Sequence, residues 1–397
     1  MWEQQELGAV VEFYSGLTYK PENVVQNGTL VIRSSNIHNN QYINADNVYV
    51  KNNIVNSEYV QEQDIVVVVR NGSRNLIGKH ALLKSIPHDP SVIGAFMTGI
   101  RSLNNQFIEA VLNTEKFKRE INKNLGATIN QITTSQFKKM KFNFPKREED
   151  KQIGILFNYL DDTIQLHERK CEELTLIKKA LLQKLFPKKD KDRPEVRYKN
   201  FSDAWEQRKL VSLFSKFTDG DWIESKDQAN TGIRLIQTGN IGITEFINKF
   251  GNEKWISEET FKKLNCEEIF PGDIIISRLP DPAGRACILP KLDTRMITAV
   301  DCTIARTSRE TSAEFIVQYL STQTYFKYVQ SCLAGGTRQR ISRKNLANFN
   351  VSIPTEINEQ KQIGFFFKQL DTLIALHQRK LEKLKQLKKF LLQNMFI

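Results

Sequence analysis

Arginine, asparagine and glutamine side chains gather in short polar stretches that occur twice along the 397-residue chain. Arginine pairs with guanine through two hydrogen bonds, asparagine and glutamine pair with adenine in the same way, and backbone amides at glycine-rich turns contact phosphate. The pattern therefore favours DNA reading, although each residue alone is also typical of an ordinary turn or helix cap. The candidates are Arg33, Ser35, Asn36, Arg70, Asn71, Arg74, Asn75, Thr128, Asn130 and Gln131, followed by Gln237, Asn240, Arg278, Arg285, Thr337, Arg338, Gln339 and Arg340.

The overall composition is compatible with a nucleic-acid partner but does not identify one. The chain has 57 Lys and Arg against 45 Asp and Glu, a net charge of +12 that attracts polyanions in general. No apolar run approaches the length of a membrane span, so no membrane partner is expected. The N-terminus "MWEQQELGAVVEF" lacks the pattern of an export signal, and the five cysteines contain no C-x-x-C pair. We expect a cytoplasmic protein without a disulfide framework or zinc site.

Catalytic patterns are weak throughout the chain. The stretch "GSRNLIGKH" from Gly72 has the wrong glycine spacing for a P-loop, and His80 stands where a magnesium-binding Ser or Thr is required. No N-P-P-[YF] or D-P-P-[YF] methyltransferase motif occurs, and "LPDPAG" from Leu279 is better explained as a turn. The sequence thus predicts neither a catalytic nor a metal site.

The most informative feature is an internal repeat. The stretch "KQIGILFNYLDDTIQLHERK" from Lys151 returns as "KQIGFFFKQLDTLIALHQRK" from Lys361. Upstream, "GATINQI" (126–132) aligns with "GGTRQRI" (335–341), and "WEQQEL" from Trp2 aligns with "WEQRKL" from Trp205. The whole chain is therefore a duplicated unit of roughly 200 residues, each copy being a globular part followed by a long helix.

The helical segments have the spacing of a coiled coil. Apolar residues recur at alternating intervals of three and four from Ile153 to Leu185, and again from Ile363 to Met395. His167 and His377 fall in this seam, where a polar residue commonly sets the register. Asp161, Asp162 and Asp371 lie on the same helices, where we expect them to face solvent or a partner. A pseudo-two-fold relation between the copies would make the helices antiparallel, with a globular part at each end of a spacer.

The globular parts read as mixed α and β, because β-branched runs such as "DIVVVVR" and "DIIISRL" precede helical patterns in both copies. The predicted class is α+β, with two mixed α/β domains in a pseudo-two-fold arrangement joined by an antiparallel coiled coil. We expect a single helix from about Asn105 in the first domain. The predicted divisions are residues 1–147 (first domain), 148–187 (first spacer helix), 188–204 (linker), 205–356 (second domain) and 357–397 (second spacer helix).

The repeated helices, the "G-x-T-x-x-x-I" turn before each and the entry "PEVRYKNFSDAWEQRKL" closely resemble the specificity subunit of Type I restriction-modification systems. The resemblance implies two target recognition domains, each reading one half of a split, asymmetric DNA site. It also implies a coiled coil that fixes the gap and docks two methyltransferase subunits, with restriction/translocase subunits joining later. No cofactor is expected on this chain, and S-adenosylmethionine would bind the methyltransferase subunits. The counterpart of "RPEVRYKNFSDA" is missing before Trp2, which would shorten an N-terminal arm of the family.

One alternative class remains, a coiled-coil scaffold whose globular ends bind protein. Such a scaffold should present apolar anchors in its loops, whereas the loops of this sequence are mainly polar. We therefore expect a DNA-reading subunit that is not catalytic alone.

Overall fold

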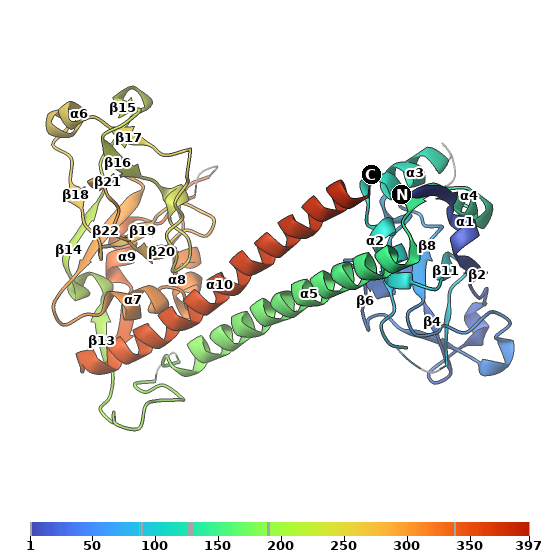
Figure 1. The fold of residues 1–397 in the computed structure, drawn as a ribbon. Coiled ribbons are helices and arrows are strands. Elements are labelled where there is room, and N and C mark those ends of the chain that lie inside the picture. The colour runs from blue at the N-terminus through green and yellow to red at the C-terminus, as the bar shows by residue number, and fades with distance from the viewer. Residues whose placement is uncertain are drawn as a thin grey trace. The chain divides into compact units, whose positions relative to one another are not determined.

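The computed structural model describes residues 2–86, 88, 90–125, 130–188, 191–336 and 339–396. The chain divides into two compact units (Figure 1). The first unit combines Met1–Arg169 with Gln378–Ile397, and the second is Lys170–His377. Both long helices, α5 (Arg147–Lys184) and α10 (Ile357–Met395), contribute one segment to each unit. The first unit is thus built from two separate pieces of sequence, and the second from one.

Two four-stranded sheets form the first unit, in the orders β10-β4-β7-β3 and β2-β11-β8-β9. Strands β4 and β10 pair in parallel, whereas the second sheet is antiparallel. Two short ladders, β1-β12 and β5-β6, complete the unit. Its strands are β1 (Glu3–Glu6), β2 (Glu12–Ser15), β3 (Val24–Val25), β4 (Thr29–Ile32), β5 (Ile37–His38), β6 (Gln41–Tyr42), β7 (Val48–Val50), β8 (Ile65–Val68), β9 (His80–Leu82), β10 (Ser91–Ile93), β11 (Met97–Arg101) and β12 (Lys141–Phe144).

The second unit repeats this plan with sheets of order β14-β22-β19-β20 and β15-β17-β16-β21-β18, and the ladder β13-β23. Strands β16 and β21 pair in parallel, as β4 and β10 do. The α+β class with two repeated parts is therefore confirmed. Its strands are β13 (Glu206–Lys209), β14 (Phe214–Asp219), β15 (Gln228–Ala229), β16 (Ile233–Ile236), β17 (Trp255–Ile256), β18 (Glu268–Ile269), β19 (Ile274–Ser277), β20 (Ala286–Ile288), β21 (Met296–Thr298), β22 (Cys302–Thr307) and β23 (Asn350–Ile353).

The single helix expected from about Asn105 is wrong, because the structure has two helices there, α2 (Asn105–Leu112) and α3 (Glu115–Asn124). Thr114 separates them: its hydroxyl accepts from the Phe117 amide at 3.2 Å and donates to the Val111 carbonyl at 2.7 Å. The second unit has the same break between α7 (Ala313–Tyr319) and α8 (Gln323–Ser331) at Thr322. A threonine favours this cap over continuing the helix. The remaining short helices are α1 (Leu7–Val10), α4 (Thr134–Lys138), α6 (Glu258–Lys263) and α9 (Arg343–Asn348).

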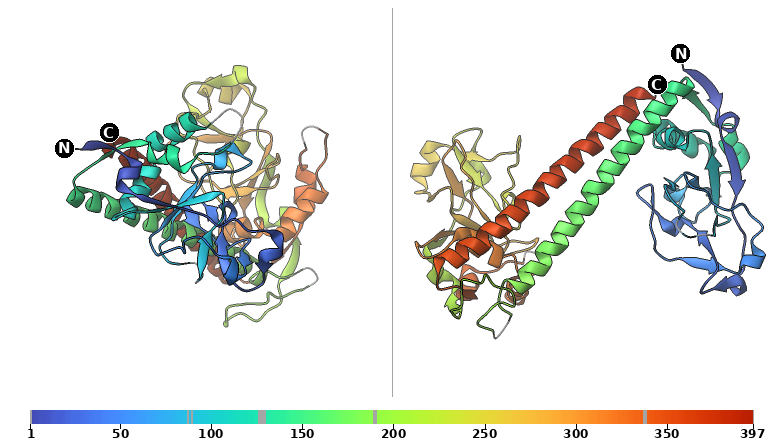
Figure 2. Two further views of the ribbon diagram at one scale, coloured as in Figure 1. Left: turned by 90° about the vertical axis from the view of Figure 1, so that its right-hand side faces the viewer. Right: turned by 60° about the horizontal axis from the view of Figure 1, so that its bottom comes forward.

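Segments of α5 and α10 lie side by side within each unit (Figure 2). In the first unit Asp161 contacts Lys388 and Glu168 contacts Lys385, so the residue number falls along one helix as it rises along the other. In the second unit Lys178 contacts Asp371, and the Phe186 and Phe367 rings stack. The pairing is thus antiparallel in both units, as the repeat predicts.

The N-terminal part of each long helix packs into the core of one globular part. A Cβ on Gly154 of α5 would lie 2.8 Å from the Phe107 amide of α2, and one on Gly364 of α10 would lie 2.6 Å from the Phe315 amide of α7. Only glycine allows so close an approach, which explains why both repeats keep it. The first turns of the predicted seam therefore belong to the domain cores rather than to a free-standing coil.

The first unit is completed by residues from the other end of the chain. Phe396 contacts Trp2, Phe107 and Phe157 at ring separations of 5.7 to 5.8 Å. Leu384, Leu391 and Met395 pack on the same core. Among the described helices, none is long and apolar enough to cross a membrane.

Candidate nucleic-acid interface

Three polar loops that are far apart in sequence meet in the first unit. Arg70, in the loop that follows β8, forms an isolated antiparallel β-bridge with Gln131. The Asn71 amide donates to the Asn130 carbonyl at 3.2 Å. The Asn130 side chain donates to the Gly72 carbonyl at 3.0 Å. The Asn71 side chain reaches the Ser34 hydroxyl at 3.2 Å, which adds the loop after β4. The fold thus gathers candidates that the sequence separates into one polar surface.

Exposed side chains on this surface are suited to contact a ligand. Arg70 is exposed, and its guanidinium lies 5.1 Å from the centre of the Phe96 ring. Arg74 and Asn75 are exposed in the same loop, and Ser35 is exposed in the loop after β4. A guanidinium stacked on an aromatic ring keeps its N–H edge available for hydrogen bonds.

Asn36 and Asn240 serve the loops themselves. Asn36 accepts from the Arg33 amide at 2.9 Å and donates to the Ala45 carbonyl at 2.6 Å. Asn240 accepts from the Gln237 amide at 3.0 Å and donates to the Ile247 carbonyl at 2.9 Å. Both are buried, so these bonds account for the residue type without DNA. The proposed interface does not include them.

Arg33 is half-buried and held by its neighbour. Its guanidinium binds the Asp46 carboxylate at 2.9 Å and the Asp46 carbonyl at 2.5 Å. This pair neutralises its charge, so Arg33 is a weaker candidate for a DNA contact than Arg70.

The second unit brings together the matching loops. The Ile341 amide donates to the Arg278 carbonyl at 3.1 Å, which joins the turn before α9 to the loop after β19. Arg285 Nη2 donates to the Thr238 carbonyl at 2.8 Å, which adds the loop after β16. As in the first unit, three distant segments meet at one place.

Arg278 and Arg285 are buried and hold these loops together. Besides Thr238, the Arg285 guanidinium donates to three further carbonyls at 2.5 to 2.9 Å, and its burial lowers its pKa. Arg278 donates to the Val300 carbonyl at 2.5 Å and lies 3.6 Å from Asp219. The Arg285 donors are used internally and both side chains are buried, so both residues are left out of the proposed interface.

Arg340 and Gln339 are exposed in the second unit, and Gln237 is half-buried. The Arg340 guanidinium is only loosely paired, 3.9 Å from Asp301, and is available to a phosphate or a base. Three predicted residues, Thr128, Thr337 and Arg338, lie outside the described residues.

Several residues of these surfaces escaped sequence reasoning. Lys79 reaches the Ser34 carbonyl at 3.1 Å, and burial lowers its pKa. Arg343 lies 3.8 Å from Asp219, and Phe96 supports Arg70. Phe96 sits between two β-branched runs, a position typical of a hairpin turn, which is the signal that could have revealed it.

The second unit also presents apolar side chains, which the sequence reading underestimated. Trp222 is 70% exposed and Phe250 is 82% exposed. Ile243 and Ile247, which lie a few residues before Phe250 in the sequence, are also exposed. Scattered apolar side chains are common on protein surfaces, but exposed aromatic rings of this kind can also anchor a partner.

Three buried cysteines of the second unit have raised pKa values. Burial raises the pKa of Cys287 and of Cys302 to about 12, and that of Cys266 to about 11. Neutral thiols are poor nucleophiles. In the part of the chain that the structure describes, no group of three or more His, Cys, Asp or Glu side chains is arranged to hold a metal.

The predicted helix carboxylates form internal ion pairs. Asp161 lies 2.5 Å from Lys388, and Asp371 lies 2.5 Å from Lys178. Asp162 contacts Lys84. These partners give all three a role in joining helices to each other or to the first domain.

Comparison with known proteins assigns the family. The model of the Type I restriction modification DNA specificity domain matches residues 1–176 and 202–386. The Type I restriction enzyme EcoKI specificity subunit of Escherichia coli (strain K12) is 23% identical over 91% of this chain and 80% of its own length. The StySPI specificity subunit of Salmonella potsdam is 27% identical over 72% of this chain and 63% of its length.

Among solved structures, the S subunit of a Type I restriction-modification system from M. genitalium covers 100% of this chain and 96% of its own. Its TM-score is 0.67 at 14% identity, which supports the fold. The two copies of the family domain coincide with the two repeats of the sequence. The chain belongs to the Type I restriction modification DNA specificity family and is a Type I specificity subunit.

Proposed function

We propose that this specificity subunit reads a bipartite, asymmetric DNA site, with one half-site for each globular part. The convergence of three polar loops in both units carries the proposal, because the scaffold is repeated while the exposed side chains differ. Arg70, Arg74 and Asn75 are the exposed candidates of the first unit. Gln339 and Arg340 are those of the second. Different side chains on one scaffold should read different bases.

The helices carry a second part of the proposal, the docking of two methyltransferase subunits. Ile155, Tyr159 and Leu166 are exposed along α5, and Phe365, Leu373 and Leu376 are exposed along α10. The two sets occupy corresponding faces of the repeated helices, at helical spacing. Two equivalent apolar stripes suit two copies of one partner. Restriction/translocase subunits would join this complex.

Chemistry is assigned to the partners in this proposal. S-adenosylmethionine would bind the methyltransferase subunits, and the chain alone would neither methylate nor cleave DNA. The complex would act in the cytoplasm, where its DNA substrate lies. Methyl transfer by the purified chain alone would contradict this division of labour.

Single arginine variants in the assembled complex test the reading surfaces. Arg70→Ala should weaken recognition of one half-site, and Arg340→Ala that of the other, each by about 1–3 kcal/mol. Such losses correspond to roughly 5- to 150-fold in affinity. Binding is measured on oligonucleotides with substitutions in either half-site, at several salt concentrations. Lys51→Ala, which removes an equal charge from an exposed position, is the control. Equal losses of DNA affinity in all three variants would show that the effect comes from net charge and not from specific contacts.

The alternative scaffold function rests on the exposed rings of the second unit. If those rings anchor a protein, Trp222→Ser with Phe250→Ser should abolish assembly while leaving DNA affinity intact. Loss of DNA affinity alone would instead place the rings at the DNA.

A further inference from the structure

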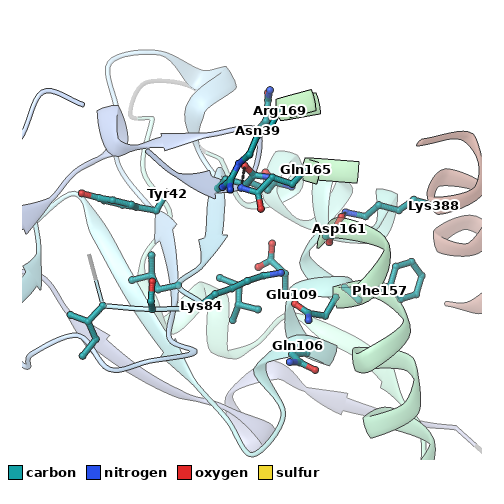
Figure 3. A pocket seen from close by; sticks show the side chains of 18 residues that line it. Asn39, Tyr42, Lys84, Gln106, Glu109, Phe157, Asp161, Gln165, Arg169 and Lys388 are labelled. Carbon is teal, nitrogen blue, oxygen red and sulfur yellow. Dashed lines mark hydrogen bonds and ion pairs between the residues drawn. The ribbon is translucent and has the colours of Figure 1, made fainter. Parts of the chain in front are cut away.

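A cavity of about 400 Å³ lies wholly within the first unit (Figure 3). Its walls come from the β5-β6 hairpin, from β9 and α2, and from α5 and α10. The hairpin turn uses Asn39 and Asn40, both with positive φ, which is the conformation a two-residue turn of this kind requires. The turn is tied to the helices, because Gln165 donates to Gln41 at 2.9 Å and Asn40 donates to Asn113 at 2.5 Å. The cavity is thus a built feature of the fold.

Glu109 is a buried carboxylate in the wall of this cavity. It is 7% exposed, and Oε1 lies 3.4 Å from His80 Nε2 and 3.3 Å from the Asn113 amide. His80 Nδ1 lies 2.8 Å from the Gly78 carbonyl, so it carries the proton that it donates there. Oε2 has no hydrogen-bond partner among the described residues. A buried oxygen without a partner costs roughly 1–3 kcal/mol, a penalty that a donor in the cavity would remove.

The second unit fills the corresponding place with its own side chains. There Val317 occupies the position of Glu109, and Gln318 occupies that of Ala110. Gln318 donates to Asp371 Oδ2 at 2.8 Å, and Thr244 donates to the same oxygen at 3.0 Å. In the first unit the counterpart of Asp371 is Asp161, which among the described residues accepts a hydrogen bond from Lys388 at 2.5 Å. A small residue at Ala110 therefore leaves the cavity open where the other copy closes it.

The remaining lining has a definite polarity. Figure 3 shows Glu109 toward one end and Arg169 toward the other, with Asn39 and Gln165 between them. Lys84 and Lys388 also line the cavity but are paired with Asp162 and Asp161, whereas Arg169 is exposed at its edge. Leu82 and Ala110 supply an apolar part of the wall. The cavity therefore offers an acceptor, a band of amides, an apolar surface and a cation.

We propose that this cavity binds an aminopurine nucleotide, with the amino group on Glu109 and the phosphate on Arg169. A carboxylate accepts from an exocyclic amino group, and side-chain amides pair with purine edges. A guanidinium matches the geometry of a phosphate. The volume admits a ligand of that size, since small-molecule sites usually occupy roughly 300–1,000 Å³. The proposal does not depend on how the subunit reads DNA.

The state of Glu109 is consistent with this role. Burial raises its pKa, whereas His80 and Lys388 lower it and Asp161 raises it. An amino group bound at Oε2 would stabilise the ionised carboxylate. Nucleotide binding should therefore release a proton in the pH range where free Glu109 is still protonated.

Direct binding to the purified full chain tests the proposal. Adenosine and guanosine 5′-monophosphates are titrated by calorimetry, with inosine 5′-monophosphate as the analogue that lacks an exocyclic amino group. We expect one site in the chain, and binding of inosine 5′-monophosphate at least about tenfold weaker than that of the better aminopurine. Equal binding of all three nucleotides, or no binding of either aminopurine at millimolar concentration, would overturn the proposal.

Variants locate the site. Ala110→Gln introduces the residue that the second unit already accommodates at this position, and it should abolish binding by filling the cavity. Arg169→Ala should weaken the monophosphate about tenfold and leave the free nucleoside unchanged. Lys389→Ala, on α10 outside this cavity, is the charge control. Thermal unfolding of each variant verifies its fold. Binding retained by a folded Ala110→Gln variant would refute the site, whatever the result of the DNA experiments.

Discussion

The two units share a backbone plan but treat one matched glutamate differently. Glu359 of the second unit is buried, and its carboxylate accepts from Arg197 at 2.7 and 2.8 Å and from Trp205 at 3.2 Å. Glu149 is its counterpart in the first unit, where among the described residues it accepts from Trp2 at 2.9 Å in an exposed setting. The same position of the repeat can thus hold a buried, hydrogen-bonded carboxylate in one copy and an exposed one in the other.

Exchange of a whole globular part should give the largest effect. Replacing residues 1–147 with the corresponding part of another family member should change one half-site completely and leave the other unchanged, because each unit has its own sheets and loops. Sequencing of methylated sites after assembly with methyltransferase subunits provides the readout. A change in both half-sites would mean that the units read DNA jointly.

Lengthening both helices tests whether they set the gap. Four residues inserted after Arg169 and four after Arg379, its matched position, fall near the boundaries between the units. The insertion approximately preserves helical phase and adds about 6 Å at 1.5 Å per residue. The preferred gap should grow by about two base pairs at ~3.4 Å per pair, with both half-sites unchanged.

The same methylation sequencing measures that gap. Insertion into α5 alone is the control, because it shifts the helices against each other and should impair assembly. An active double insertion with an unchanged gap would show that another feature sets the spacing.

The matched glutamates should differ in their contribution to stability. Glu359→Gln removes the charge from a buried, doubly hydrogen-bonded pair and should destabilise the second unit by about 1.5–3 kcal/mol. Glu149→Gln should change the first unit by no more than about 0.5 kcal/mol. Hydrogen exchange of peptides from each unit separates the two responses. Equal losses of stability in the two variants would show that the burial of Glu359 does not increase its contribution to stability.

A smaller difference concerns pH. Burial raises the pKa of Glu109 above its value in the unfolded chain, so the folded first unit binds a proton more tightly. This contribution is fully present below the unfolded pKa and is lost as pH rises through the folded pKa. Each unit of pKa difference corresponds to about 1.4 kcal/mol.

Glu109→Gln should flatten the dependence of stability on pH for the first unit. The second unit carries Val317 at this position and should lack this contribution. Hydrogen exchange of α2 and α7 peptides, corrected for intrinsic rates, compares the units in one sample. A slope that persists unchanged in this variant would show that Glu109 is not its source.

The sequence reveals the repeat, the family and the mixed class because identical residues and apolar spacing are local signals. It also identifies loops that meet in space, as Arg70 and Gln131 do. It does not reveal that Asn240 and Arg285 donate hydrogen bonds to loop carbonyls, since those contacts depend on the folded path of the chain. The break at Thr114 was missed because its apolar neighbours continue a helical pattern across a cap. The DNA contacts of the exposed loops stay predictions.

The packing of Phe396 against Trp2 and Phe107 has a consequence for biogenesis. Domains made early during translation generally fold first, at synthesis rates of about 5–20 residues per second. Here the domain made first is completed by the last turns of α10, which are synthesised roughly 12–50 s after its residue 147 at those rates. Until then part of its aromatic core is exposed to solvent and accessible to chaperones. A nascent chain that stops before the end of α10 would therefore leave its first domain incompletely packed, so folding of the first domain depends on synthesis of α10.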